Sequence, residues 1–411
     1  MIGEFDDATS QSAFLDLALI HGAGSLDLVI ALKDFGRAAS TSNQKATAGA
    51  LDSLQQSGGQ LALYNALLLL NAQQARAAFD QLSGEGHASA SGALVQGSSA
   101  IRDVISNRIR AAFGNAGTSS DFPIMAFGPG GPRLAPAGTP DSGPWAQVSG
   151  NWASHGGDGN AARSSSQGAQ FLAGADGMLG GVRLGAFAGY GRTDFSSPFR
   201  SFAGAADSWF LGAYGGTKVG ALSVRAGFVQ GWHNLATTRT VSLPGFSDRL
   251  EARYGSRTTQ LFGELGYAFE TAAARFEPFV GLSHLRHRTG AYSETGGAAA
   301  LSAASASAVS YTTLGLRAET SLSLGGTQAK LHGMLGWQHA FGDVNPATTH
   351  AFAGGNGFTV TGSPIARNAA LFETGLDVKL TPTASLGLSY QGRFASGGID
   401  HGARASCRLA F

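Results

Sequence analysis

Few side chains in this sequence are spaced for catalysis. Ser83, Glu85 and His87 lie close together and supply the nucleophile, acid and base types of a hydrolase triad. A triad is defined by its geometry in space, and neighbours on one short stretch rarely form one. No Gly-x-Ser-x-Gly turn stands between a strand-like and a helix-like segment, as a nucleophile elbow requires. We therefore expect no catalytic residue and no enzyme activity in this chain.

A second group of side chains has the types that bind a metal ion or a phosphate. His284 and His287 stand beside Arg286 and Arg288. Metal sites are built from cysteine, histidine and carboxylate ligands, and no cysteine or pair of acidic residues accompanies these histidines. The many glycines produce chance glycine motifs, but none ends in the Gly-Lys-Ser/Thr of a phosphate-binding loop. The sequence predicts no metal site and no cofactor.

Composition narrows the class of protein. Charged residues make up 13% of the 411 residues, about half the usual share in soluble proteins. The net charge of +1 argues against nucleic acid as a partner, since a nucleic-acid-binding protein carries a basic excess. Cys407 is the only cysteine, so no disulfide can form within the chain. No segment reaches the ~20 apolar residues of a transmembrane helix.

From Trp145 onward the sequence reads as a series of strands. Apolar and polar residues alternate, and successive side chains of a strand face opposite sides. In the last run Leu409 and Phe411 share one side, while Arg404 and Arg408 share the other. We expect twelve strands, each long enough to cross a bilayer: Trp145–His155, Gln167–Gly177, Gly181–Thr193, Ala205–Lys218, Ala221–Thr237, Tyr254–Glu270, Arg275–Gly290, Val309–Leu324, Thr327–Gly342, Ile365–Leu380, Ala384–Ala395 and Ile399–Phe411.

Two features favour a membrane barrel over a soluble β-sandwich. Short turns such as Gly177–Gly181 alternate with long polar loops such as Thr237–Tyr254, the arrangement of outer-membrane barrels. Aromatic residues also stand near strand ends, where an interfacial girdle requires them: Trp145, Tyr190, Tyr267, Phe269, Tyr390 and Phe394. Because lipid leaves no backbone amide unpaired, the first and twelfth strands should pair. The predicted fold is an all-β transmembrane, 12-stranded antiparallel outer-membrane β-barrel.

The strand faces opposite the lipid should line the lumen of this barrel. The charged residues expected there are Arg183, Glu264, Glu270, Glu319, Glu373, Asp377, Arg393, Arg404 and Arg408. The group from His284 to Arg288 lies near a rim, where it would face water or the phosphates of lipopolysaccharide.

The first part of the chain is rich in helix formers, and its last helix is amphipathic. Within Gly97–Phe113, apolar residues are interleaved with charged ones: Ile101, Arg102, Asp103, Val104, Ile105, Arg108, Ile109 and Arg110. An ordinary helix packed on a neighbour is the alternative. Its position before a barrel with acidic inner faces instead predicts a helix that threads and plugs the lumen.

The expected organisation has five parts. Residues 1–40 read as closing rungs of a β-solenoid, although short strands or a helix of another fold stay open. Residues 41–96 form a mainly helical junction, 97–114 the pore helix, 115–143 a linker rich in proline and glycine, and 144–411 the barrel. Acidic residues follow Met1 where a signal peptide would be basic and then apolar. We therefore expect a processed product or C-terminal fragment of a longer precursor.

These features resemble the C-terminal translocator of autotransporters, the type V secretion proteins of Gram-negative bacteria. The resemblance covers about residues 41–411. It rests on Asn43 and Gln44 with Ala50–Asp52, on Phe79–Glu85 with His87–Ser89, on Pro144–Gln147, on Phe171–Asp176, and on the terminal Phe411. Small residues such as Ala405 and Cys407 depart from the larger groups common in the family's last strand.

The resemblance implies that the barrel anchors in the outer membrane and delivers its own N-terminal passenger to the cell surface. It implies Leu409 and Phe411 as an assembly signal, with the barrel-assembly machinery, periplasmic chaperones, outer-membrane lipids and lipopolysaccharide as partners of a monomer. Self-cleaving members need an asparagine pair in the pore helix, and here Asn107 follows Ser106, so self-cleavage by that route is not predicted. The alternatives are a porin-like channel with an N-terminal helical plug and an enzyme within residues 1–115.

Overall fold

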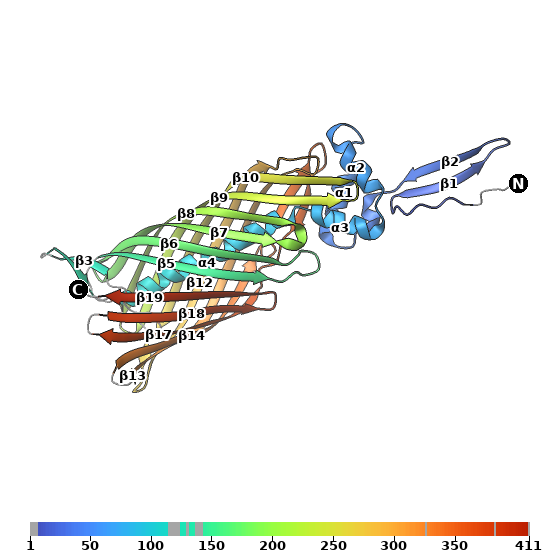
Figure 1. Cartoon of the computed structure of the whole chain (residues 1–411). Coiled ribbons are helices and arrows are strands. Elements are labelled where there is room, and N and C mark those ends of the chain that lie inside the picture. Colours follow the sequence, from blue (N-terminus) through green and yellow to red (C-terminus); the bar gives the residue numbers. More distant parts are fainter. Residues whose placement is uncertain are drawn as a thin grey trace.

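The structure is a computed structural model that describes residues 7–113, 124–128, 131–135, 143–324, 327–381 and 384–409. The described chain has a long β-barrel with one helix inside it, three helices at one end, and a two-stranded ribbon projecting beyond them (Figure 1). We call the end that carries the three helices the capped mouth, and the opposite end, where the last strand finishes, the linker mouth.

Twelve antiparallel strands form the barrel wall, each paired with its sequence neighbour in the wall. The last strand, β19, pairs with the first, β5, through Gly398–Ala403 and Gly150–His155, so the sheet closes. The predicted 12-stranded closed barrel is therefore confirmed. Its strands are β5 (Gly143–His155), β6 (Ser164–Leu179), β7 (Val182–Ser197), β8 (Phe202–Val219), β9 (Leu222–Leu243), β10 (Phe246–Tyr267), β12 (Arg275–Ser293), β13 (Leu301–Leu324), β14 (Thr327–Gly342), β17 (Asn368–Thr381), β18 (Ala384–Ala395) and β19 (Gly398–Leu409).

The connections differ between the two mouths. At the linker mouth β6 and β7 are joined through Gly180 and Gly181, whose φ angles of 57° and 86° lie in the left-handed region that tight hairpins use. At the capped mouth the predicted long loop Thr237–Tyr254 is wrong. There β9 and β10 continue as 22-residue strands and turn at Pro244 and Gly245. Short pieces complete the sheet: β11 (Phe269–Glu270), β15 (Ala347–Phe352) and β16 (Phe358–Thr361), with the 3-10 turn η3 (Pro198–Arg200) before β8.

The segment before the barrel forms a helical cap on the capped mouth. Two of its helices begin with capping boxes, Thr41 with Gln44 and Asn71 with Gln74, which satisfy the free amides of the first turn. The cap comprises η1 (Phe35–Ala38), α1 (Ser42–Asp52), η2 (Gly58–Gln60), α2 (Leu61–Leu68) and α3 (Ala72–Leu82). Its core is continuous with the extended strand ends: Phe14, Phe35, Leu67 and Phe79 belong to one buried cluster with Val241, Leu250, Leu301 and Phe352.

The ribbon at the N-terminal end consists of β1 (Leu15–His21) and β2 (Leu26–Leu32), paired antiparallel along their length. Apolar side chains of both strands, including Ile20, Leu28 and Ile30, are about half exposed. The solenoid-like rungs expected for residues 1–40 stay a prediction.

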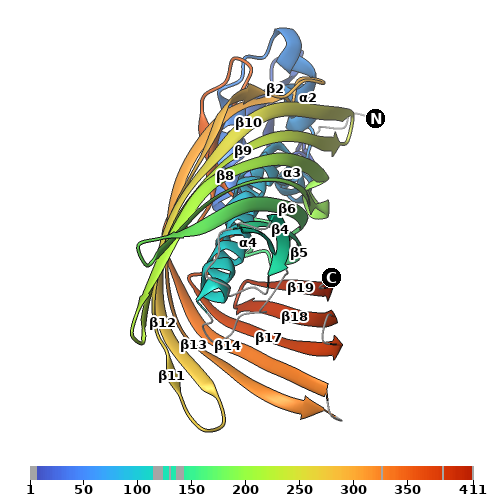
Figure 2. The ribbon, with the colours of Figure 1, turned by 90° about the vertical axis from the view of Figure 1, so that its left-hand side faces the viewer.

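Helix α4 (Glu85–Ala112) follows Gly84, whose φ of 69° lets the chain turn sharply from α3 into the barrel. The helix begins well before the predicted Gly97, and Figure 2 shows it between the opposite walls of strands. In the expected linker, β3 (Ile124–Gly128) and β4 (Gly131–Ala135) form a small hairpin, which accommodates Pro132 because a two-stranded ribbon has only edge strands. Among the helices that the structure describes, none combines the length and apolarity needed to cross a membrane.

Candidate functional site

The apolar face of α4 packs against one side of the barrel lumen. Ile101, Val104, Ile105 and Ile109 are at most 1% exposed, and their spacing places them on one stripe of the helix. They form a cluster with inward side chains of six strands: Trp145, Leu172, Phe187, Phe210, Tyr214, Val229 and Phe262. The predicted threading of the lumen is therefore confirmed, and the contact is mainly hydrophobic.

A single carboxylate fixes the end of the helix near the linker mouth. Arg108 donates from Nε and from an η nitrogen to Asp176, at 2.7 and 3.0 Å. The same carboxylate accepts hydrogen bonds from the Tyr214 hydroxyl at 2.6 Å and from Arg183. The indole of Trp145 in turn donates to the Tyr214 oxygen at 2.7 Å. Asp176 therefore joins the helix to strands β5, β6, β7 and β8, with the side chains of Asp176 and Arg183 buried and that of Arg108 8% exposed.

A second buried network crosses the wall from β9 to β13. Arg225 donates to Glu264 at 2.6 Å and to Glu277 at 2.9 Å, and Arg317 binds the same two carboxylates at 2.7 and 3.0 Å. The Arg317 guanidinium also lies 3.5 Å from the centre of the Phe279 ring. Each charge has an opposite partner, as buried charges require.

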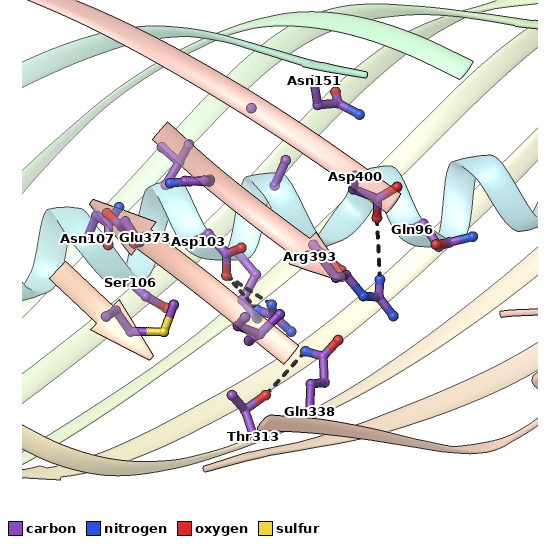
Figure 3. A pocket seen from close by; sticks show the side chains of 18 of the residues that line it. Gln96, Asp103, Ser106, Asn107, Asn151, Thr313, Gln338, Glu373, Arg393 and Asp400 are labelled. Atoms are coloured by element: carbon purple, nitrogen blue, oxygen red, sulfur yellow. Dashed lines mark hydrogen bonds and ion pairs between the residues drawn. The ribbon is translucent and has the colours of Figure 1, made fainter. Parts of the chain in front are cut away.

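The polar face of α4 borders a cavity of about 180 Å³ between the helix and the strands opposite its apolar contact. Figure 3 shows Asp103, Asn107, Glu373 and Arg393 among its lining residues. The Arg393–Asp400 ion pair, at 3.8 Å, closes one side. Polar and apolar side chains both line this cavity, which has room for on the order of ten water molecules. One side of α4 is therefore packed against the wall, and the other side borders this space.

At the capped mouth one network fastens the cap to the barrel. The Asn43 amide of α1 donates to Glu85 at 3.0 Å and to the Thr361 carbonyl at 2.8 Å. Glu85, the first residue of α4, accepts from the Ala162 backbone at 2.7 Å and from Arg200 at 2.9 Å. The contacts join α1, α4, two barrel loops and β16, so residues that carry the family resemblance hold the cap in place.

His87 takes part in a separate cluster one turn into α4. Its Nδ1 lies 2.9 Å from the Tyr254 hydroxyl and its Nε2 lies 2.9 Å from Glu294. Glu294 is also bound by Arg239, which donates to the Gln81 carbonyl of α3 at 2.8 Å. Ser83 donates instead to the Asp80 carbonyl. The side chains of Ser83, Glu85 and His87 therefore have separate partners and form no triad.

We expect docking of the cap to weaken as the pH falls below about 6.5. His350 of β15, outside the barrel wall, is buried beside His87, and burial lowers its pKa from 6.5 to about 3. The folded chain then binds fewer protons than the unfolded chain, so this contribution is complete above pH 6.5 and is lost as the pH falls toward 3. Burial opposes ionisation of Glu294, but Arg239 and His87 outweigh it and hold the pKa of Glu294 below its ordinary 4.5. More acid therefore weakens docking further.

The distance between labels on Lys45 of α1 and Arg249 of β10, both exposed, would follow this release. His350→Phe keeps a buried ring without a titrating group, and it should remove the loss between pH 6.5 and about 4.5. A wild-type distance that stays constant down to pH 4 would contradict the prediction.

The structure places most of the expected lumen charges on the inner face: Arg183, Glu264, Glu319, Glu373, Asp377 and Arg393. Glu319 lies 3.4 Å from Lys330, and Asp377 lies 3.5 Å from His332. The prediction for Glu270 is wrong, because this residue lies on the short strand β11 at the linker mouth, is exposed, and pairs with Arg275. The side chains of Arg404, Arg408 and Leu409, and the whole of Phe411, lie outside the described residues.

The outward aromatic residues follow the parity of each strand. Tyr190, Tyr267, Phe269 and Phe394 are 39–55% exposed, and Tyr390 lies on the same outward face of β18 as Phe394. The prediction that Trp145 belongs to the girdle is wrong, because its side chain is 8% exposed and points into the lumen. Even-numbered residues of β5 face outward, so Trp152, at 52% exposure, is the girdle residue of that strand.

Several residues of the site were missed in the sequence. Asp176, Tyr214, Arg225 and Glu277 are all inward and buried. The alternation of faces along each strand could have indicated them, since each lies on the face opposite exposed apolar neighbours such as Val224 and Val280. The group from His284 to Arg288 is split by the same parity: His284, Arg286 and Arg288 face outward, whereas His287 is buried.

Comparisons with known proteins agree with this geometry. The autotransporter beta-domain family matches residues 144–391. Two proteins described as extracellular serine protease from Serratia marcescens are each 31% identical to this chain, covering 100% of it and 42% of their own length. The chain thus spans less than half of these relatives. The translocator domain of the autotransporter NalP from Neisseria meningitidis has the same fold, with a TM-score of 0.55 at 17% identity over 78% of this chain and 100% of that one. The chain therefore belongs to the autotransporter family, and its barrel is an outer-membrane translocator.

Proposed function

We propose that this barrel delivers an N-terminal passenger to the cell surface and is then plugged by its own α4. The observation that carries the proposal is the path of the chain. Helix α4 runs through the lumen from the capped mouth, where Glu85 lies, to the linker mouth, where Gly216 contacts Ile109. Residues 7–83 therefore lie at the opposite end of the barrel from the end of β19 (Figure 1).

Folding at the capped mouth supplies a reason for one-way movement. A chain must be unfolded or at most helical to pass a lumen of this kind. Once α1, α2 and α3 pack their apolar residues against Val241, Leu301 and Phe352, withdrawal would expose that core to water, which is unfavourable. We propose that the transport unit itself is not an enzyme.

The remaining partners follow from the outer-membrane location. We propose that the barrel-assembly machinery and periplasmic chaperones insert the barrel, that outer-membrane lipids and lipopolysaccharide surround it, and that it acts as a monomer. Leu409 and Phe411 are proposed as its assembly signal. The exposed outward leucines and aromatic residues, such as Leu211, Leu261 and Trp209, form the surface that lipid would cover.

An epitope placed before Asp7, in a chain expressed with a secretory signal, tests this orientation. We expect added protease to remove the epitope from intact cells, because the cap lies on the surface. An epitope in the Gly220–Ala221 turn of the linker mouth is the matched control and should stay protected. Protection of the N-terminal epitope with a correctly folded barrel would instead favour a porin-like channel plugged from the periplasm.

A further inference from the structure

Four arginines lie on the outward face of two neighbouring strands, between the middle of β10 and the capped mouth. Arg253 and Arg257 belong to β10, Arg286 and Arg288 belong to β12, and all four are exposed. Within the described part of the chain none of the four has an ion-pair or hydrogen-bond partner. Other outward arginines nearby do have partners: Arg192 lies 3.1 Å from Asp207, and Arg249 lies 3.4 Å from Glu251.

The strand register forces two of these cations together. Arg257 of β10 is directly opposite Arg288 of β12, and Arg286 is opposite Thr259 one step along the same face. Side chains directly opposite one another have Cβ atoms about 5 Å apart, and like charges in that position repel. The sequence thus places mutually repelling groups on an exposed wall, an arrangement that an anion between them would stabilise.

Aromatic and apolar residues near the arginines indicate their level relative to the membrane. Paired outward residues form one row across five strands: Tyr190, Trp209, Trp232, Arg257 and Arg288. Aromatic residues of this kind mark the boundary between acyl chains and head groups. On the side toward the linker mouth, the outward residues of β10 and β12 become apolar, with Leu261, Leu265, Val280 and Leu282 exposed. The guanidinium groups therefore lie at head-group level, directly above a lipid-facing surface.

Two glycines lie between the arginines, so the backbone there carries no side chains. Gly255 and Gly290 face outward across the β10–β12 pair, and a Cβ on Gly290 would be 3.5 Å from the Gly255 carbonyl. On the next strand the residue opposite Arg288 is Ala306. These small residues leave room on the surface for a bulky head group. Arg253 lies at one end of this space, and Arg257 and Arg288 lie at the other.

We propose that Arg253, Arg257, Arg286 and Arg288 bind the phosphates of lipid A, the acylated, doubly phosphorylated sugar of lipopolysaccharide. Guanidinium groups bind phosphate oxygens through two parallel hydrogen bonds. A phosphate between Arg257 and Arg288 would remove their repulsion, and the acyl chains would cover Leu261 and Leu282. The site rests on the proposal that lipopolysaccharide is a partner and that the capped mouth faces the cell surface.

Binding of purified hexa-acylated lipid A to the full chain in nanodiscs, followed by native mass spectrometry, tests the site. We expect the double variant Arg257→Gln/Arg288→Gln to bind at least about tenfold more weakly, since charge-assisted hydrogen bonds are lost. Arg249→Gln, which removes an arginine already paired with Glu251, is the matched control and should bind as the wild type does. Arg257→Lys/Arg288→Lys keeps the charges and should recover part of the affinity.

Two further lipids and inorganic phosphate separate the sources of binding. Dephosphorylated lipid A should bind as weakly as the double variant does, and phosphatidylglycerol and inorganic phosphate should compete poorly with lipid A. Equal binding of phosphatidylglycerol, or unchanged affinity in the double variant, would overturn the proposal. Surface exposure of the N-terminal epitope in the same variant is measured separately. Loss of lipid A binding with the epitope still exposed supports the site, whereas loss of exposure in the wild type would count against the proposed function.

Discussion

Replacing Asp176 with alanine is expected to lower the free energy of unfolding by about 3–5 kcal/mol, the usual effect of removing one partner of a buried ion pair. The carboxylate accepts hydrogen bonds from Arg108, Arg183 and Tyr214. Without it the guanidinium groups of Arg108 and Arg183, which are 8% and 1% exposed, lose their countercharge. Urea unfolding of the barrel in detergent, followed by heat-modifiable gel migration, would measure the change.

A surface ion pair provides the control for this prediction. Asp207→Ala removes the partner of Arg192 on the outward face, where both side chains are about half exposed. Exposed pairs contribute about 0–1 kcal/mol, so this variant should unfold almost as the wild type does. Because Asp176 also holds Arg108 of α4, Asp176→Ala should in addition make the channel flicker open more often in planar bilayers. Equal stability of the two variants would show that Asp176 is not the anchor.

The barrel could be predicted from the sequence because its physics is local. Alternation along each strand is set by the requirement that one face meets lipid and the other meets the lumen. Leu386 and Leu388 in β18, like Leu261 and Leu265 in β10, make that alternation plain. Closure follows from the absence of backbone partners in lipid, so the pairing of β19 with β5 needed no further information.

The strand ends at the capped mouth could not be predicted in the same way. Beyond the membrane the outward residues of β9 are polar, such as Thr238 and Ser242, so the sequence there reads as a loop. What keeps it in strand form is the inward row, Val241 and Leu243, which packs against the cap. That contact is between segments far apart in the sequence. The early start of α4 has a similar cause, because Glu85 and His87 are held by partners on loops far away in the sequence.

The sequence predicted that the pore helix meets acidic residues of the lumen, but not which residues it contacts. The arginines of α4 were expected to meet acidic lumen residues, and Arg108 does so, but its partner is Asp176. One-dimensional alternation tells which side chains face inward. It cannot tell which of them reaches a helix that touches only one side of the lumen, because that depends on helix rotation and barrel shear.

Deletion of Gly97–Phe113 is expected to raise single-channel conductance severalfold. The deleted residues form most of α4 within the lumen, roughly 25 Å of helix at 1.5 Å per residue. In the part of the chain that the structure describes, α4 fills much of the lumen and borders a cavity of about 180 Å³. Deletion of Leu15–Leu32, the exposed ribbon outside the lumen, is the control and should leave conductance unchanged. Recordings in planar bilayers at neutral pH and moderate salt would measure both variants.

The contacts at the capped mouth remain in this deletion variant and could block ions on their own. Residues 85–96 remain in the shortened chain, and Glu85 and His87 keep their partners on the barrel loops and on β10. A variant that begins at residue 114 lacks the cap as well as the helix and should conduct at least as much as the deletion. High conductance only in the second variant would show that the network at the capped mouth blocks the ions. Helix α4 would then only connect this network to the rest of the chain. Unchanged conductance in both variants would mean that the barrel wall itself closes the lumen. This result would contradict the prediction that α4 is the plug.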